Sequence, residues 1–191
     1  MSKIPTIPAT ERLTFRLMDR SDAPLLFELD QDPEVMRFLN DGKPSTWEEI
    51  ENFFVPRMEG FTKAELGHGL WAVMDRQSDA YLGWILARQY GIGTTYHEPD
   101  NLELGWRLKR FCWGKGIATE AAREVMLAVL QLDASIRVVS AIADAENVAS
   151  TTVMKKLGMR YVDDRVHVTP LRTFDVAYYE MPAPRELLRD R

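Results

Sequence analysis

Two glycines and a lysine stand directly before a strongly periodic apolar segment, in the stretch WGKGIATEAAREVM from Trp113 to Met126. Gly114 and Gly116 let the backbone turn tightly and approach a ligand without a Cβ in the way. No Ser, Thr, Asp or Asn precedes the segment, so the first N–H groups of a helix there lack a side-chain cap. Such groups lie at the positive end of the helix dipole and bind anions. The stretch therefore predicts a phosphate-binding turn.

The charges around this turn agree with an anionic ligand. Between Leu104 and Thr119 there are no acidic residues and four basic ones, namely Arg107, Lys109, Arg110 and Lys115. This is a local reversal in a chain whose net charge is −5. Neither a Walker loop nor a dinucleotide fingerprint fits, because the first needs G-x-x-x-x-G-K-[ST] and the second needs a third glycine where Thr119 stands. Two glycines alone are equally compatible with a plain connecting turn; the uncapped helix and the basic residues favour a ligand.

The elements on either side of the turn must hold it in place. Alternation in NLELGWRLKRF predicts a strand over 101–111 leading into it, with HEPD at 97–100 as a solvated loop. Helical periodicity predicts a helix over 117–132 leaving it. A strand over 135–143 follows, and then a helix that Asn147 caps and Gly158 ends. The strand, turn and helix thus form the usual setting of a phosphate site.

The rest of the chain adds strands and helices on both sides of this centre. The N-terminal half predicts a strand over 12–19, a helix capped by Ser21 or Asp22, a short helix at 33–39, a helix from Ser45 with Glu48 closing a capping box, and strands over 69–76 and 80–90. The C-terminal end predicts two antiparallel strands, over 159–168 and 172–181. The order indicates an α/β protein built on a mostly antiparallel sheet with crossover helices in the middle.

Length and composition limit the function classes. A chain of 191 residues, 46% of them hydrophobic, suits a single domain with a sizeable core over 1–191. The acidic balance argues against a nucleic-acid partner, and no apolar run is long enough for a membrane span. The single cysteine, Cys112, excludes an internal disulfide, and MSKIPTIPAT has no signal-peptide core. We therefore expect a soluble, cytoplasmic protein.

Three segments in order resemble the GCN5-related N-acetyltransferases (GNAT), and more narrowly the RimJ/RimL-like branch that acetylates ribosomal-protein N-termini. WGKGIATEA resembles motif A, LELGWRLKRFCWGKG the fourth strand and cradle, and AENVASTTVMKKLGMRYV the Asn-x-x-Ser helix and the next strand. With TERLTFRLMDRSDAPLLFELDQDPEVMRFL, which resembles the opening strand and helix, they cover most of Thr10 to Val162. Trp113 departs from the Arg or Gln common in the wider family but matches an aromatic position of the branch. The resemblance implies a GNAT fold (α+β) over about 10–181, a twisted sheet of about seven strands with helices on both faces.

The resemblance also implies acetyl-CoA as co-substrate and no metal. The pyrophosphate would lie on backbone N–H groups of the turn, at Gly114, Lys115, Gly116, Ile117, Ala118 and Thr119. The pantetheine arm would pair with the backbone of Trp106 to Leu108 and contact Asn147, and the Leu108 N–H would donate to the thioester carbonyl. Lys109 and Arg110 are counted among the cofactor-binding residues.

The amine must lose a proton, and the thiolate leaving group benefits from one. The E-x-G pattern of the resemblance makes Glu103 the candidate general base, directly or through a water. Its alternative role is a polar residue on a half-buried strand. Ser150 is the candidate proton donor, or else a first-turn residue that bonds the local backbone. Tyr161 ranks behind it, as a residue more typical of a core; Cys112, with no histidine near it in sequence, is expected to be a buried thiol.

These residues together favour an N-acetyltransferase that acts on a primary amine by direct attack, through a tetrahedral intermediate. The acceptor is a protein N-terminus or a small molecule; a non-catalytic acyl-CoA-binding module and an antibiotic or polyamine acetyltransferase are the alternatives. A monomer and a homodimer both stay open. Aromatic residues that could wall the acceptor cleft are Trp47, Phe53, Phe54, Trp71, Trp84 and Tyr90.

Overall fold

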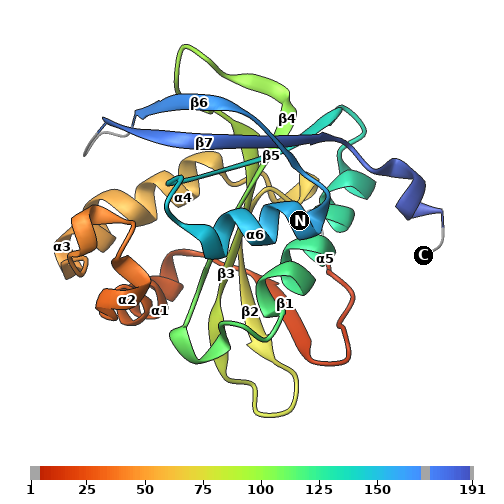
Figure 1. Ribbon diagram of the computed structural model, residues 1–191. Helices are drawn as coiled ribbons and strands as arrows, with labels where there is room; N and C mark the ends of the chain where they lie inside the picture. Colours follow the sequence, from red (N-terminus) through yellow and green to blue (C-terminus); the bar gives the residue numbers. More distant parts are fainter. Residues whose placement is uncertain (1–4, 169–172, 190–191) are drawn as a thin grey trace.

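The computed structural model describes residues 5–168 and 173–189 and contains one seven-stranded sheet. The strands lie in the order β1-β2-β3-β4-β5-β7-β6. Their bounds are β1 (Leu13–Leu17), β2 (Gly69–Asp75), β3 (Tyr81–Tyr90), β4 (Glu98–Leu108), β5 (Val138–Ala143), β6 (Arg160–Val168) and β7 (Thr173–Pro182). Neighbouring strands are antiparallel except β4 and β5, which are parallel. The sheet is strongly twisted, so that β6 and β7 run across the direction of β1–β3 (Figure 1).

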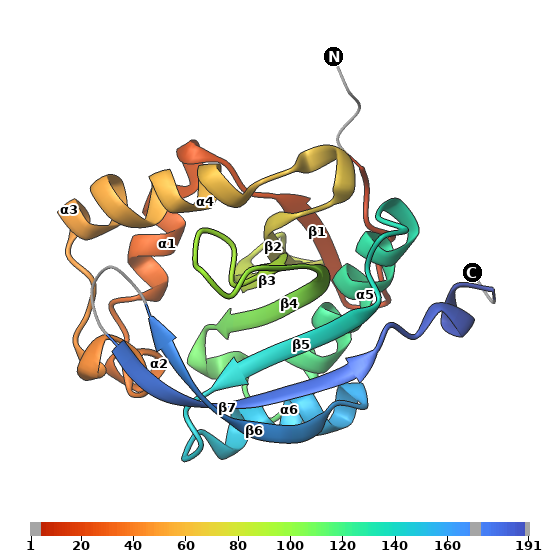
Figure 2. The same cartoon turned by 90° about the horizontal axis from the view of Figure 1, so that it is seen from above.

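Helices cover both faces of this sheet. The α-helices are α1 (Ala23–Leu29), α2 (Pro33–Met36), α3 (Trp47–Glu49), α4 (Val55–Phe61), α5 (Ile117–Leu132) and α6 (Val148–Leu157). A π-helical segment, η3 (Ile50–Phe54), joins α3 to α4, and single 3-10 turns are η1 (Arg20–Asp22), η2 (Asn40–Gly42), η4 (Ala64–Leu66), η5 (Arg110–Cys112) and η6 (Arg185–Leu188). Figure 2 shows α1–α4 on one side of the strands and α5 on the other. Among the described residues, no helix is both long enough and apolar enough to cross a bilayer.

The alternation of side chains along β2 explains why the sheet needs both helical layers. Trp71 and Val73 face the core under α5, while Leu70 and Ala72 face the core under α1–α4. Successive residues of a strand point to opposite faces, so an apolar residue at every position requires a cover on each side. The sheet separates the two cores. The candidate site lies where two neighbouring strands of the sheet separate.

The parallel strands β4 and β5 separate soon after they pair. Their ladder runs from Asn101 opposite Val138 to Glu103 opposite Ser140 and then ends. The Lys109 N–H donates to the Leu82 carbonyl of β3 at 2.8 Å. Successive N–H groups along a strand point alternately to its two neighbours, so the N–H groups of Leu108 and Trp106 point to the side of β5. The backbone N–H groups of Trp106 and Leu108 therefore point into the gap beyond the ladder, where β5 no longer pairs with them.

Most predicted elements are found, with shifted ends. Helix α5 has the predicted bounds, whereas β4 begins and ends three residues earlier than the predicted strand 101–111. Glu98 to Asp100, predicted as loop, are the first residues of β4, since Glu98 pairs with Tyr90 of β3. The C-terminal pair β6–β7 is antiparallel as predicted, and Arg172 of the second predicted strand lies outside the described residues.

The predicted caps of two N-terminal helices differ in detail from the structure. Thr46 and Glu49, not Ser45 and Glu48, form the capping box of α3, because the Ser45 hydroxyl donates instead to the buried carboxylate of Asp30 at 2.6 Å. Asp22 is the N-cap residue of α1, as one of the two predicted alternatives, but its carboxylate makes no cap hydrogen bond because it accepts from Arg16 at 2.8 Å and from the Asp19 N–H at 2.9 Å. In both places a tertiary or local polar contact takes the side chain that sequence alone assigned to the cap.

Candidate active site

A cavity of about 850 Å³ lies where β4 and β5 separate, and it extends between the N-terminal ends of α5 and α6 and the α2–α4 region. Most of the predicted cofactor-binding residues line it, together with one of the two predicted catalytic residues. These lining residues are Trp106, Leu108, Gly114, Gly116, Ile117, Ala118, Thr119, Asn147 and Ser150. Glu103, Lys109, Arg110 and Lys115 are not among the lining residues.

The glycine turn leaves the start of α5 open to a ligand. Gly114 and Gly116 have φ angles of 73° and 77°, which side chains with a Cβ rarely adopt. Gly116 is the N-cap residue, and no side chain caps the helix. The acidic residue of the first turn, Glu120, is bound by Arg12, which also donates to the Lys115 carbonyl at 3.0 Å. The site thus offers uncapped N–H groups, and the nearest carboxylate is already neutralised.

The exposed edge of β4 supplies polar backbone groups beside this turn. The Trp113 indole donates to the Leu108 carbonyl at 2.9 Å, which fixes the end of β4 against the turn. The Leu108 N–H points into the gap between β4 and β5 and has no strand partner there. An extended amide chain could pair with this edge as an added strand does. The two features together suit a ligand with a phosphate end and an amide arm.

The start of α6 closes the other side of the gap. Asn147 caps α6 by accepting from the Ser150 N–H at 3.1 Å, as predicted. The Ser150 hydroxyl in turn accepts a hydrogen bond of 3.3 Å from the Trp106 indole of β4. The hydroxyl proton of Ser150 is therefore free to point toward the cavity, because the oxygen is the acceptor in this contact.

Glu103 lies beside the cavity, behind an arginine. Glu103 is 4% exposed, and Arg88 of β3 donates to both its oxygens, at 2.9 and 3.0 Å. Arg88 lines the cavity, and its guanidinium lies over the Phe61 ring. Glu103 is thus fully buried and ion-paired on its strand, and its role as general base stays a prediction.

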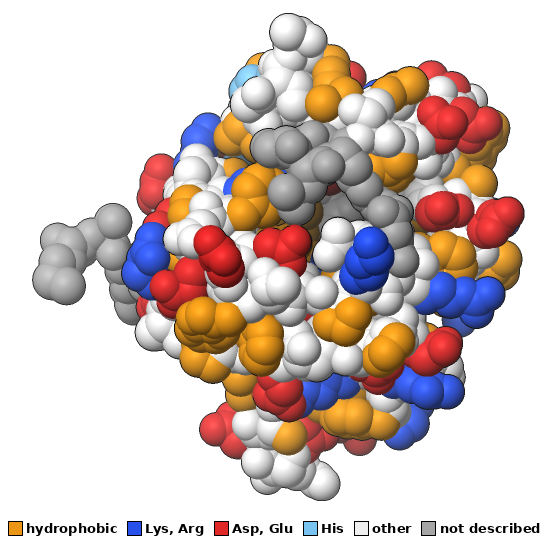
Figure 3. All heavy atoms as spheres, turned by 90° about the vertical axis from the view of Figure 1, so that its left-hand side faces the viewer, with side chains coloured by type: hydrophobic (Ala, Val, Ile, Leu, Met, Phe, Trp, Pro, Cys, Tyr) orange, Lys and Arg blue, Asp and Glu red, His pale blue; other side chains and the backbone are white. Residues whose placement is uncertain are grey.

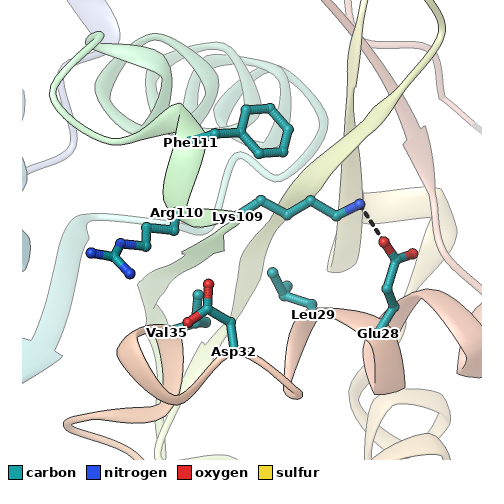
Figure 4. A pocket seen from close by; sticks show the side chains of 7 residues that line it. All are labelled: Glu28, Leu29, Asp32, Val35, Lys109, Arg110 and Phe111. Atoms are coloured by element: carbon teal, nitrogen blue, oxygen red, sulfur yellow. Dashed lines mark hydrogen bonds and ion pairs between the residues drawn. The ribbon is translucent and has the colours of Figure 1, made fainter.

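The basic side chains of Arg107 and Lys109, before the turn, bind carboxylates of the α1 region. Arg107 pairs with Asp30, and the Lys109 ammonium binds Glu28 at 2.7 Å. Lys109 and Arg110 line a second hollow, of about 590 Å³, beside α1 and α2 (Figure 4). Their side chains therefore do not surround the glycine turn as the spacing in sequence suggested, because residues of β4 and the following turn face the α1–α2 layer.

Only some of the predicted aromatic residues wall the cavity. Phe53, Phe54 and Trp84 line it, but Trp71 and Tyr90 are buried in the core and Trp47 stacks on Phe27. On the outer face of α1–α4, acidic and basic side chains are interspersed with apolar ones (Figure 3). On the part of this face that the described residues form, acidic side chains are therefore mixed with basic and apolar ones.

Tyr161 and Cys112, the remaining candidate residues, have surroundings typical of structural side chains. Tyr161 is 52% exposed on β6, stacks on Tyr179 and does not line the cavity. Cys112 is buried at the cavity wall, and burial raises the pKa of its thiol. Within residues 5–168 and 173–189, no three His, Cys, Asp or Glu side chains are grouped as metal ligands.

Two arginines of the cavity wall, Arg88 and Arg57, were not among the predicted site residues. Arg88 stands inside the apolar strand AYLGWILARQY, where a charged residue is rare unless it is paired. That position was the available signal for an ion pair with a carboxylate of the neighbouring strand. Nothing in the helix containing Arg57 distinguished it from a solvated residue.

Comparisons with known proteins agree with this geometry. The family model described as "Acetyltransferase (GNAT) domain" matches residues 12–160. The "Uncharacterized N-acetyltransferase YnaD" of Bacillus subtilis (strain 168) is 28% identical over 151 residues, which cover 79% of this chain and 81% of that protein. A GNAT-family acetyltransferase structure from Bacillus anthracis superposes with a TM-score of 0.70 at 26% identity, over 93% of this chain and 98% of that one. Aminoglycoside acetyltransferase AAC(6')-Ib in complex with coenzyme A has the same fold, with a TM-score of 0.72, 16% identity and coverage of 93% and 99%.

Proposed function

Because the chain belongs to the GNAT acetyltransferase family, we propose that it transfers the acetyl group of acetyl-CoA to a primary amine. The observation that carries this proposal is the uncapped start of α5 beside the unpaired edge of β4, within one cavity. That combination matches a ligand made of a diphosphate and an extended amide arm.

The residues that would hold acetyl-CoA are those of the glycine turn and the two sides of the gap. Backbone N–H groups of Gly114 to Thr119 would bind the diphosphate, because a helix N-terminus favours negative charge. The edge of β4 from Trp106 to Leu108 and the side chain of Asn147 would hold the amide arm. Acetyl-CoA would supply the activated acetyl group as a thioester.

The protein's own groups would assist the transfer in three ways. The Leu108 N–H would stabilise negative charge on the thioester oxygen, since it points into the gap. The Ser150 hydroxyl would donate a proton to the departing sulfur. Glu103 would accept a proton from the amine through water; the two hydrogen bonds from Arg88 fix the direction of this carboxylate and keep it from direct contact with the cavity.

The acceptor amine would enter from the α2–α4 side, between the aromatic walls. We propose a soluble, cytoplasmic enzyme that resembles the RimJ/RimL-like branch, with either a protein N-terminus or a small molecule as acceptor. An aminoglycoside is named in the neighbouring AAC(6')-Ib structure with ribostamycin, but identity of 15% carries only the fold over to this chain.

The test combines binding and turnover. Calorimetry with CoA, and deuterium uptake at the glycine turn with and without CoA, measure the binding part; thiol release from acetyl-CoA with a panel of amines measures the transfer. We expect a binding heat, protection of residues 114–119 and turnover on at least one amine. Binding without turnover on every amine would instead support a non-catalytic module, and absence of binding would overturn the whole proposal.

A further inference from the structure

A guanidinium that is hydrogen-bonded and ion-paired to none of the described residues lies in the wall of the cavity on the α1–α4 side of the sheet. Arg57 belongs to α4, between the buried side chains of Val55 and Met58, and is itself half-buried. Within the described part of the chain it makes no hydrogen bond and no ion pair. Burial, and to a lesser degree repulsion from Arg88, lower the pKa of Arg57. The fold therefore keeps a partly desolvated cation at the cavity without compensating it.

The carboxylate that acts on Arg57 is not available as a partner. That carboxylate is Glu103, which is already ion-paired with Arg88 through both oxygens and makes no hydrogen bond with Arg57. Arg107, the other half-buried arginine of this wall, is neutralised by Asp30, and Arg37 is exposed at the rim. Arg57 thus adds to this end of the cavity a positive charge that is ion-paired with none of the described carboxylates, and such a charge attracts an anion and repels a polycation.

The surroundings of Arg57 limit the kind of anion. The planar guanidinium fork binds a carboxylate through two parallel hydrogen bonds. The cavity walls on the same side are aromatic, formed by Phe53, Phe54, Phe61 and Trp84. The Tyr96 hydroxyl, which has no hydrogen-bond partner in the described residues, also interacts electrostatically with Arg57. A small molecule with a carboxylate and an apolar body fits this wall better than a polyamine.

We propose that Arg57 binds a carboxylate of the acceptor, so that the acceptor is a small molecule of the amino-acid class, with an amine and a carboxylate. This inference rests on the proposed acetyl transfer and specifies its substrate. In this role Arg57 sets the specificity and the affinity for the acceptor. It binds the carboxylate of the acceptor, while the amine of the acceptor reaches the gap between β4 and β5.

The experiment compares matched acceptors in the full-length protein. Thiol release from saturating acetyl-CoA is measured with amino acids and with their carboxamides, which share the amine and lack the charge, and with short peptides and spermidine. We expect kcat/KM for the carboxylate to exceed that for the carboxamide by about 10- to 100-fold, the usual worth of a hydrogen-bonded charge pair. Arg57→Gln should bring this ratio close to one, mainly through KM, and Arg57→Lys should restore part of it.

Two controls separate a binding role from a structural one. Arg20→Gln removes an exposed arginine that pairs with Glu59 of α4, and should leave the ratio unchanged. Arg57→Gln should not lower the melting temperature, because no internal partner is left behind; a fall of the melting temperature together with equal losses on both acceptors would mean a structural role and overturn the proposal.

The outcomes also distinguish this inference from the proposed function. Turnover on carboxamides or spermidine as fast as on amino acids would overturn the inference and leave the acetyl transfer standing. Peptides preferred over free amino acids in an Arg57-dependent way would overturn the small-molecule class. If no amine is acetylated although CoA binds, calorimetry of amino acids against the CoA-loaded protein still decides: Arg57-dependent binding supports the carboxylate site, and no binding in either variant overturns it.

Discussion

Arg88 and Glu103 stand directly opposite each other on β3 and β4 and share two hydrogen bonds, of 2.9 and 3.0 Å, in the interior of the protein. Both residues are almost fully buried, at 6% and 4% exposure. A buried ion pair costs much desolvation energy and is easily replaced by apolar residues, but breaking it from one side is severe. The pair therefore offers a way to separate the structural and catalytic roles of Glu103.

We expect Glu103→Gln to lower the free energy of unfolding by about 3–5 kcal/mol, because it leaves the Arg88 charge buried without compensation. The double variant Arg88→Met with Glu103→Met should recover most of this stability. If Glu103 is the base, the double variant should fold and bind CoA but lose about 100-fold or more in kcat. Denaturant unfolding and thiol release check both parts, and a well-folded double variant with normal kcat would rule out Glu103 as the base.

Ser150 is expected to matter for turnover more than for stability. Ser150→Ala removes the acceptor of the Trp106 indole, a partly buried hydrogen bond of 3.3 Å whose loss costs about 1 kcal/mol. If the hydroxyl protonates the leaving thiolate, kcat should fall by about 100-fold while CoA affinity stays the same.

Ser150→Thr and Trp106→Phe are the controls for this prediction. The threonine keeps a hydroxyl and should retain part of the activity, whereas the phenylalanine removes only the indole donor and should leave kcat within a few-fold. Equal losses in Ser150→Ala and Trp106→Phe would show that the contact, rather than the proton, is what matters.

The sequence alone predicts the glycine turn and α5 well because both are local. Glycines at positive φ, an absent cap and a continuous apolar stripe all lie within one stretch of the chain, from Gly114 to Leu132. The Asn147 cap of α6 is local in the same way and is confirmed. Each of these features depends on backbone conformation a few residues away and on no distant partner.

The pairing of charges, by contrast, depends on the register between distant elements. Lys109 and Arg107 looked like part of a basic cluster around the turn, but they bind Glu28 and Asp30, which lie about 80 positions earlier in the chain. Arg88 and Glu103 likewise meet only because β3 and β4 pair in one particular register. A list of nearby charges in sequence cannot supply that register, so it could not show that Lys109 binds Glu28 or that Arg88 binds Glu103.

The left-handed conformation of Gly114 should be needed for binding and not only for folding. Gly114 has a φ of 73°, and an added Cβ would meet no atom within 4 Å, so Gly114→Ala introduces backbone strain and little else, about 1–2 kcal/mol. Because the proposed site uses the N–H groups of this turn to bind the diphosphate, we also expect CoA affinity to fall by about tenfold or more.

Gly93 provides a matched control for this substitution. It has a φ of 80°, an added Cβ there also meets nothing within 4 Å, and it lies in the β3–β4 loop away from the cavity lining. Gly93→Ala should lower the melting temperature by about as much as Gly114→Ala does. Its CoA affinity, measured by calorimetry, should be that of the wild type. If both variants lost affinity equally, the effect of Gly114→Ala would come from stability and not from the turn.

A buried histidine predicts how stability changes with pH. His68 is 1% exposed, and burial lowers its pKa. The Asp133 carboxylate, 3.2 Å from the ring, acts in the opposite direction and partly offsets this effect. Lys63 and Glu65 are the other charges that act on the ring. The unfolded chain takes up a proton near pH 6.5, whereas the folded chain takes it up only at lower pH. Between these two values the unfolded state binds more protons, so stability rises with pH and is lost as the pH falls below about 6.5.

The melting temperature measured from pH 5 to pH 8 checks this sign. In the wild type, we expect the melting temperature to fall on the acid side, as this one group lowers the free energy of unfolding by up to about 1.4 kcal/mol per pH unit. Asp133→Asn should extend the fall to lower pH, because it removes the charge that supports protonated His68, while His68→Gln should flatten it. His97→Gln, at an exposed position, should leave the profile as it is. A wild-type protein that instead gained stability on acidification through this window would show that His68 is charged in the folded state and that its pairing with Asp133 outweighs its burial.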